Sequence, residues 1–187
     1  MLPVPGLTLA GLYGVEIQKP GDGVTRRVQA EMVREMINRV KAAWAQLIDG
    51  RSGFLLEDKG MAVALHSRLA NAAEADIVVP QAQAVVTQMA SPEFRVLGGD
   101  RFLEIAPAVA HKGETVNWFL EHIPFPNALP VYFGDDDKDE EAFAVIRKHD
   151  GIPILVGARQ PDTVALVRLP SPVEARVWLR AILDAAQ

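Results

Sequence analysis

The chain has 187 residues, of which 49% are hydrophobic and 23% are charged, a composition typical of a globular protein and not of a disordered one. Its formal net charge of -5 and the lack of a run of Lys and Arg argue against a nucleic-acid partner, because such affinity depends on clustered cations. Without cysteines it can form neither disulfides nor thiolate metal sites, and no apolar stretch is long enough to span a membrane, so we expect a cytoplasmic protein.

The first segment predicts a strand over residues 7–17 that two glycines interrupt. Gly11 and Gly14 permit tight turns or close backbone approach at these points. A cluster of turn-forming residues follows at Pro20–Gly23. We expect this turn to mark the passage from one domain into another.

The middle of the chain predicts two amphipathic helices, each followed by a hairpin. Apolar residues recur at helical spacing from Ala30 to Ile48 and from about Glu74 to Ala90. Four short extended segments follow the helices in pairs, at residues 53–58, 61–68, 94–97 and 101–105. Two helices can cover one face of four antiparallel strands, so residues 28–106 are predicted to form an α+β domain whose other sheet face is open.

Side chains of both charge signs are expected on that open face. Strand alternation turns the apolar residues of the first hairpin toward the helices, namely Phe54, Leu56, Val63 and Leu65. It turns Glu57, His66 and Arg68 the opposite way, with Lys59 at the tip. Exposed cross-strand ion pairs are one explanation, and recognition of a hydroxylated or phosphorylated ligand is the other. For His66 alone, a structural role is the simpler explanation.

Helices and strands alternate after Pro107, which is typical of a parallel sheet covered by helices. The expected helices are residues 113–122, 139–148 and 172–185, and the expected strands are residues 129–133, 152–156 and 164–169. Trp44, Trp118 and Trp178 fall on apolar stripes of predicted helices, so we expect them in the core.

A dense group of carboxylates follows the strand at residues 129–133, with aspartates at positions 135, 136, 137 and 139. Carboxylates a few Å apart repel one another by roughly a kcal/mol or more, so a cation is a natural partner, and Mg²⁺ prefers oxygen ligands. Ligands of open α/β sheets bind beyond the carboxyl ends of strands, where this group falls. The alternative is a solvated helix start, where the helix dipole favours acidic residues. An EF-hand is excluded, because Glu140 and Ile146 stand where its glycine and bidentate Glu belong.

Four segments together resemble one known family. Residues 134–143, GDDDKDEEAF, resemble the motif GDDxTDEDxF of trehalose-phosphate phosphatases, a branch of the haloacid dehalogenase superfamily, with Lys138 and Glu141 as departures. Residues 57–60 and 65–68 resemble the EDKG and LHYR segments of its cap hairpin. Residues 104–113 resemble VE(I/V)(R/K)PxxxNKG, with Ala106 and His111 as departures, and residues 12–17 resemble GxHGxEI, with Tyr13 in place of His.

The resemblance implies a fold, an activity and a set of site residues. The fold would be α/β, a haloacid dehalogenase-like parallel sheet core formed by residues 1–27 and 107–187, with an inserted α+β cap at residues 28–106. The activity would be that of a magnesium-dependent hydrolase that converts trehalose 6-phosphate to trehalose and phosphate in trehalose biosynthesis. By this resemblance, Lys112 would hold the transferring phosphate. Glu57, Lys59, Arg68 and Glu104 would bind the sugar, and Asp135, Asp136 and Asp139 would hold Mg²⁺.

One family motif, DxDGT, is absent from these 187 residues. In the family its first Asp is the nucleophile and its second is the general acid and base. We therefore expect either a phosphatase whose nucleophile segment this chain lacks, or a non-catalytic fragment or pseudoenzyme that binds a sugar phosphate or a partner chain. A core sheet without that strand would also expose apolar surface and leave an edge unpaired.

Overall fold

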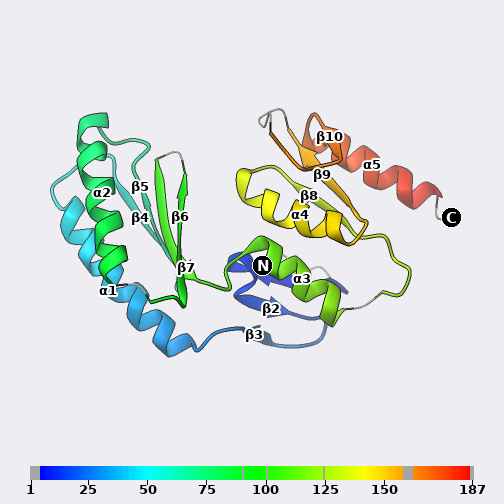
Figure 1. Cartoon of the computed structure of the whole chain (residues 1–187), viewed down its shortest axis with the longest axis horizontal. Helices are drawn as coiled ribbons and strands as arrows, with labels where there is room; N and C mark the ends of the chain where they lie inside the picture. Colours follow the sequence, from blue (N-terminus) through cyan, green and yellow to red (C-terminus); the bar gives the residue numbers. More distant parts are fainter. Residues whose placement is uncertain (1–4, 90, 100, 124, 158–161, 186–187) are drawn as a thin grey trace. The chain divides into compact units, whose positions relative to one another are not determined.

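The computed structural model describes residues 5–89, 91–99, 101–123, 125–157 and 162–185. The chain divides into two compact units, Met1–Ala110 and His111–Gln187, which are described separately (Figure 1). Residues 1–27 belong to the first unit by their contacts. Their predicted membership in one core domain with residues 107–187 stays a prediction.

The first unit begins with a small antiparallel sheet in the order β1-β2-β3. Its strands are β1 (Leu9–Gly11), β2 (Glu16–Gln18) and β3 (Val24–Arg26). The strand predicted over residues 7–17 is thus two strands, separated by the 3-10 turn η1 (Leu12–Gly14). Gly14 has a φ of 91°, a left-handed conformation that glycine adopts without strain.

The rest of the first unit confirms the predicted two helices and four antiparallel strands. The elements are α1 (Ala30–Ile48), β4 (Leu55–Asp58), β5 (Val63–His66), α2 (Ala72–Met89), β6 (Phe94–Gly99) and β7 (Phe102–Pro107). The strands pair in the order β4-β5-β7-β6, and α1 and α2 lie along one face of this sheet (Figure 1). Of the residues in the predicted second helix, Ala90 lies outside the described residues.

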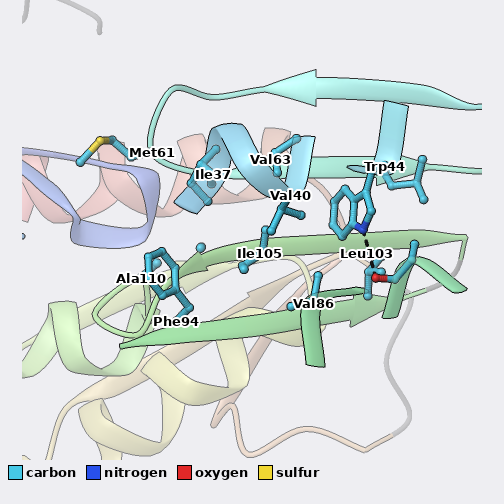
Figure 2. Close-up of a cluster of buried hydrophobic side chains, with 14 of the residues drawn as sticks. Ile37, Val40, Trp44, Met61, Val63, Val86, Phe94, Leu103, Ile105 and Ala110 are labelled. Atoms are coloured by element: carbon cyan, nitrogen blue, oxygen red, sulfur yellow. Dashed lines mark hydrogen bonds between the residues drawn. The ribbon is translucent and has the colours of Figure 1, made fainter. Parts of the chain in front are cut away.

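The core of this unit lies between the two helices and the sheet (Figure 2). The apolar stripe predicted on α1 is buried, with Val33, Ile37, Val40 and Trp44 at most 2% exposed. Figure 2 shows Val40 and Trp44 near Val63 and Ile105 of the sheet. The indole of Trp44 donates its Nε1–H to the carbonyl of Ala82 on α2 at 3.0 Å, so the one polar atom of this ring is satisfied inside the core.

The second unit contains a parallel sheet, as predicted, in the order β10-β9-β8. Its elements are α3 (Lys112–His122), β8 (Val131–Gly134), η2 (Asp137–Asp139), α4 (Glu140–Lys148), β9 (Ile152–Val156), β10 (Val167–Leu169) and α5 (Pro172–Ala185). Phe143 and Ile146 anchor α4 in the core of this unit and are at most 3% exposed. None of the described helices of the chain combines the length and apolarity needed to cross a bilayer.

α5 forms over the predicted residues, but its apolar stripe is exposed in the described structure. Its large apolar residues are 46–64% exposed, namely Val173, Val177, Leu179, Ile182 and Leu183. A sheet of three strands, in which β10 has three residues, offers too little apolar surface to cover a helix of 14 residues. β8 is also an edge of this sheet among the described strands.

Trp118 and Trp178 are likewise half-buried and not in the core, contrary to prediction. The ring of Trp118 stacks on that of His122 with centroids 4.6 Å apart. The rings of Trp178 and Phe133 pack edge to face, with centroids 5.4 Å apart. Their stripes lack an apolar surface that covers them, so helical spacing alone overestimated their burial.

Two neighbouring valines of α2 test the packing of the first unit. Val78 is 0% exposed in the core, whereas Val79 is half-buried. Val78→Ala should lower the free energy of unfolding by about 1–3 kcal/mol, because it removes buried methyl groups and leaves a cavity. Val79→Ala makes the same change in helix propensity but removes methyl groups that are only half-buried. Urea titrations should therefore show a smaller loss in the free energy of unfolding for this variant. Equal losses would contradict this packing.

Candidate functional site

A buried carboxylate, that of Asp139, organises the loop that follows β8. Asp139 is 2% exposed, and its Oδ1 accepts hydrogen bonds from Lys112 Nζ at 2.7 Å and from the Tyr132 hydroxyl at 2.7 Å. Its Oδ2 accepts from the backbone N–H groups of Asp135 at 2.9 Å and Asp136 at 3.1 Å. Four donors therefore replace the water that burial removes from this charge.

Gly134 makes this arrangement possible at the end of β8. A Cβ at this position would lie 2.4 Å from the Cβ and Cγ of Asp139, so a larger residue would displace the carboxylate. Residues 132 and 134 point to the same side of the strand, and for this reason the Tyr132 hydroxyl reaches the same carboxylate. Asp136 then caps η2 by accepting from the N–H groups of Lys138 and Asp139.

Lys112 brings α3 to this loop. Its ammonium also lies 3.1 Å from Asp136 Oδ1, so it bridges two carboxylates. Gly113 allows α3 to pack closely on α4, because a Cβ there would lie 2.7 Å from the carbonyl oxygen of Glu141. His111 is the N-cap of α3, and its Nδ1 accepts from the N–H groups of Gly113 at 3.1 Å and Glu114 at 3.3 Å.

The same contacts fix the charges of the three central groups. Burial would raise the pKa of Asp139, but the bonds from Lys112, Tyr132 and the two backbone N–H groups hold it below its usual value of 3.8. Burial would lower the pKa of Lys112, whereas its bonds to Asp139 and Asp136 raise it above 10.5. Burial and the bond to Asp139 both raise the pKa of Tyr132. At neutral pH the site therefore holds an ammonium, a carboxylate and a neutral phenol.

The three aspartates predicted to bind a metal lie together. Asp135, Asp136 and Asp139 each offer a carboxylate oxygen, and these atoms lie within 4.8 Å of one another. Asp139 is saturated by its four donors, whereas Asp135 is exposed and its carboxylate has no partner among the described residues. This donor set fits a largely hydrated Mg²⁺ bound mainly through Asp135, since Mg²⁺ prefers oxygen ligands and retains water.

Three of the four predicted sugar-binding residues meet on the sheet of the first unit. Glu104 on β7 is 0% exposed, and its Oε2 lies 2.8 Å from Lys59 Nζ. Lys59 lies 3.6 Å from Glu57 Oε2, which in turn lies 3.0 Å from Nε2 of His66. Burial would lower the pKa of Lys59, but the bond to Glu104 and the charge of Glu57 raise it, so Lys59 stays charged between the two acids.

Glu104 leaves one acceptor unused. Its Oε1 is buried and has no hydrogen-bond partner among the described residues, a costly arrangement unless a further donor arrives. The fourth predicted residue, Arg68, does not join this cluster. Arg68 lines a cavity of about 450 Å³ with Arg101, His66 and Phe102, together with Gly53, Leu55 and Leu69.

Tyr132 was not predicted as a site residue, and neither was the contact of His111 with Glu141, whose Oε2 lies 3.0 Å from His111 Nδ1. Strand alternation could have indicated Tyr132, because it shares a strand face with Gly134. His66, for which a structural role was expected, bonds Glu57 across the hairpin at 3.0 Å.

Asp139→Asn tests the buried carboxylate. The substitution should lower the free energy of unfolding of the second unit by about 2–4 kcal/mol at pH 7, because it leaves Lys112 with a neutral partner. The folded pKa of Asp139 lies below its usual 3.8, so the contribution is present above that value and is lost as pH falls through the folded pKa. In Asp139→Asn, the free energy of unfolding should therefore not show this fall at acid pH.

Urea titrations from pH 3 to pH 7 measure both effects. Asp137→Asn is the matched control, since Asp137 is an exposed aspartate of the same loop. An equal loss in both variants would mean that the buried bonds of Asp139 contribute no more than an exposed charge.

Comparisons with known proteins show which family the sequence resembles. The sequence model of the trehalose-phosphatase family matches residues 1–172. A probable trehalose-phosphate phosphatase of Sinorhizobium fredii is 32% identical over 177 residues, covering 93% of this chain and 63% of its own length. The trehalose-phosphate phosphatase of Mycobacterium tuberculosis is 35% identical over 178 residues, covering 90% of this chain and 44% of its own. The chain thus spans about half the length of such relatives.

Solved structures confirm the fold. Aspergillus fumigatus trehalose-6-phosphate phosphatase superposes with a TM-score of 0.70 at 20% identity, over 98% of this chain and 71% of that one. A trehalose-6-phosphate phosphatase related protein gives a TM-score of 0.75 at 18% identity, over 93% of this chain and 70% of that one. The predicted α/β fold of the haloacid dehalogenase type is therefore confirmed, and the chain belongs to the trehalose-phosphatase family.

Proposed function

We propose that this chain supplies the phosphate-binding, metal-binding and sugar-binding parts of a magnesium-dependent phosphatase that converts trehalose 6-phosphate to trehalose and phosphate. The observation that carries the proposal is the ammonium of Lys112, held 2.7 Å from the buried Asp139 beside the exposed carboxylate of Asp135. A positive group fixed next to a cation site is what a phosphoryl group needs, because its oxygens carry the charge that must be neutralised. The names of the relatives point to the same substrate.

In this proposal Lys112 binds a phosphoryl oxygen, and Asp139 fixes its position. An ammonium held by two carboxylates loses little conformational freedom on binding, so the geometry is set before the substrate arrives. When bound, Mg²⁺ supplies Lewis-acid neutralisation of the phosphoryl oxygens. Asp135 would be its main protein ligand, with Asp136 in support.

Glu104, Lys59 and Glu57 would bind the sugar. Two carboxylates on either side of an ammonium offer acceptors and donors to neighbouring hydroxyls, and such charge-assisted bonds are the strong ones. The unused Oε1 of Glu104 supports this proposal, because a sugar hydroxyl would satisfy it. Arg68 lies outside these contacts and would act on the ligand from the neighbouring cavity.

The nucleophile is not found among the 187 residues, since they contain no DxDGT motif. We therefore propose that the isolated chain releases no phosphate from trehalose 6-phosphate, because no aspartyl-phosphate can form. The second candidate function, binding of a sugar phosphate without turnover, is favoured by the same absence. A cytoplasmic location stays a prediction from the sequence.

Asp135→Asn tests the metal site by calorimetry with Mg²⁺. Wild-type binding should be weak, and the substitution should weaken it by about tenfold or more, because it removes the one exposed carboxylate of the cluster without a partner among the described residues. Asp137→Asn changes the net charge of the loop equally and should have a smaller effect. Magnesium binding that survives Asp135→Asn unchanged would place the metal elsewhere.

Glu104→Gln tests the sugar site, with trehalose as the probe in calorimetry on the whole chain. The affinity should fall by about tenfold, because a neutral amide accepts more weakly and Lys59 loses its closest partner. Glu31→Gln, at an exposed position on α1, is the control and should change nothing.

Arg68→Ala then decides whether Arg68 belongs to this sugar site. A loss like that of Glu104→Gln would place it there, and no loss would remove it from the predicted set. Unchanged trehalose binding in Glu104→Gln would contradict the assignment of the sugar site.

A further inference from the structure

The Nδ1 atom of His111 has more partners than it can serve in one protonation state. It lies 3.1 Å from the N–H of Gly113 and 3.3 Å from that of Glu114, both of which need an acceptor. It also lies 3.0 Å from Oε2 of Glu141, a carboxylate oxygen that can accept a hydrogen bond but not donate one. This nitrogen carries either a lone pair or a proton, so it can satisfy one side or the other.

From this conflict we infer that His111 is a positioning residue that switches between two partners and thereby controls access to the first turn of α3. In the neutral state, with the proton on Nε2, the ring caps α3 and occupies the N–H groups of Gly113 and Glu114. In the protonated state, Nδ1–H donates to Glu141 on α4 and releases both groups. The helix dipole also disfavours a cation over the N-terminus, which pushes the protonated ring toward Glu141.

The switch acts next to the proposed phosphate site. Lys112 is the residue between His111 and Gly113, and its ammonium is fixed by Asp136 and Asp139. Backbone N–H groups at a helix start bind anions, but those of Gly113 and Glu114 are occupied while His111 caps the helix. Release of the cap would add two donors beside Lys112, and only this link to anion binding rests on the proposed function.

No charged side chain other than Glu141 contacts Nδ1 among the residues that the structure describes. On α3 the charged residues nearby are Lys112, which bonds the acidic loop, and Glu114, whose N–H is one of the capped groups. On the preceding segment, the carbonyl of Ala110 accepts from Arg95 of β6 at 3.2 Å. Glu141 is the acidic side chain that α4 places at the ring. His111 and Glu141 are also two of the positions at which the sequence departs from the family motifs, so the two departures meet in one contact.

Nitrogen-15 NMR of the whole 187-residue chain from pH 5 to pH 8 tests the switch. The amide signals of Gly113 and Glu114 should shift with the same midpoint as the His111 ring. His111→Asn keeps a cap acceptor that does not titrate, so in this variant the two amides should stay constant.

His149→Asn, at an exposed histidine after α4, is the matched control and should leave the response of both amides intact. Amides that stay constant while the His111 ring titrates would overturn the switch. A response that survives in His111→Asn would overturn it equally.

Sulfate tests the link to anion binding separately, because it stays a dianion over this pH range. Sulfate should bind wild type several-fold more tightly at pH 5.5 than at pH 8, and His111→Asn should lose this dependence while His149→Asn keeps it. A pH dependence equal in wild type and His111→Asn would overturn the link. Sulfate that binds no form of the chain would count against the proposed phosphate site, while the amide titration would still decide the switch.

Discussion

The second unit depends on the buried charge of Asp139. One carboxylate joins the end of β8, the turn η2 and the start of α3, because its donors come from Tyr132, from the loop backbone and from Lys112. These donors take the place of bulk water around a side chain that is only 2% exposed. The requirement for glycine at position 134 and the raised pKa of Lys112 both follow from this placement.

The first unit supports its polar cluster in a different way. Glu104 stands on β7 opposite Ala64 of β5, within a sheet whose other face is covered by α1 and α2. Lys59 lies in the turn between β4 and β5, and its Nζ reaches Oε2 of Glu104 at 2.8 Å. Within this cluster, the buried Oε1 of Glu104 has no hydrogen-bond partner among the described residues.

Periodicity predicted the elements well wherever an apolar surface exists to cover them. The bounds of α1 were predicted to the residue, because its stripe meets the sheet, and the four strands of the first unit have the predicted antiparallel pairing. The same rule overestimated the burial of α5, whose stripe finds only a three-stranded sheet. β3 was missed because its three residues are all exposed and carry no alternation of burial.

The sequence predicted which residues form the site better than it predicted the contacts between them. The motif order placed Lys112 and the three aspartates near one another, as the structure has them. The role of Tyr132 and the contact of His111 with Glu141 depend on how β8, α3 and α4 pack, which no spacing in the sequence encodes. Arg68 was grouped with Glu57 by strand alternation and by the resemblance of residues 65–68 to the family hairpin, but it lies beyond the end of β5 and lines a cavity with His66 and Arg101.

The most direct test of this account is to map two ligands onto the chain by NMR, in the presence of Mg²⁺. Inorganic phosphate should shift the signals of Lys112 and the loop around Asp135, and trehalose should shift those of Lys59 and Glu104. If phosphate leaves the signals of Lys112 and this loop unchanged, or trehalose leaves those of Lys59 and Glu104 unchanged, the proposed function is contradicted.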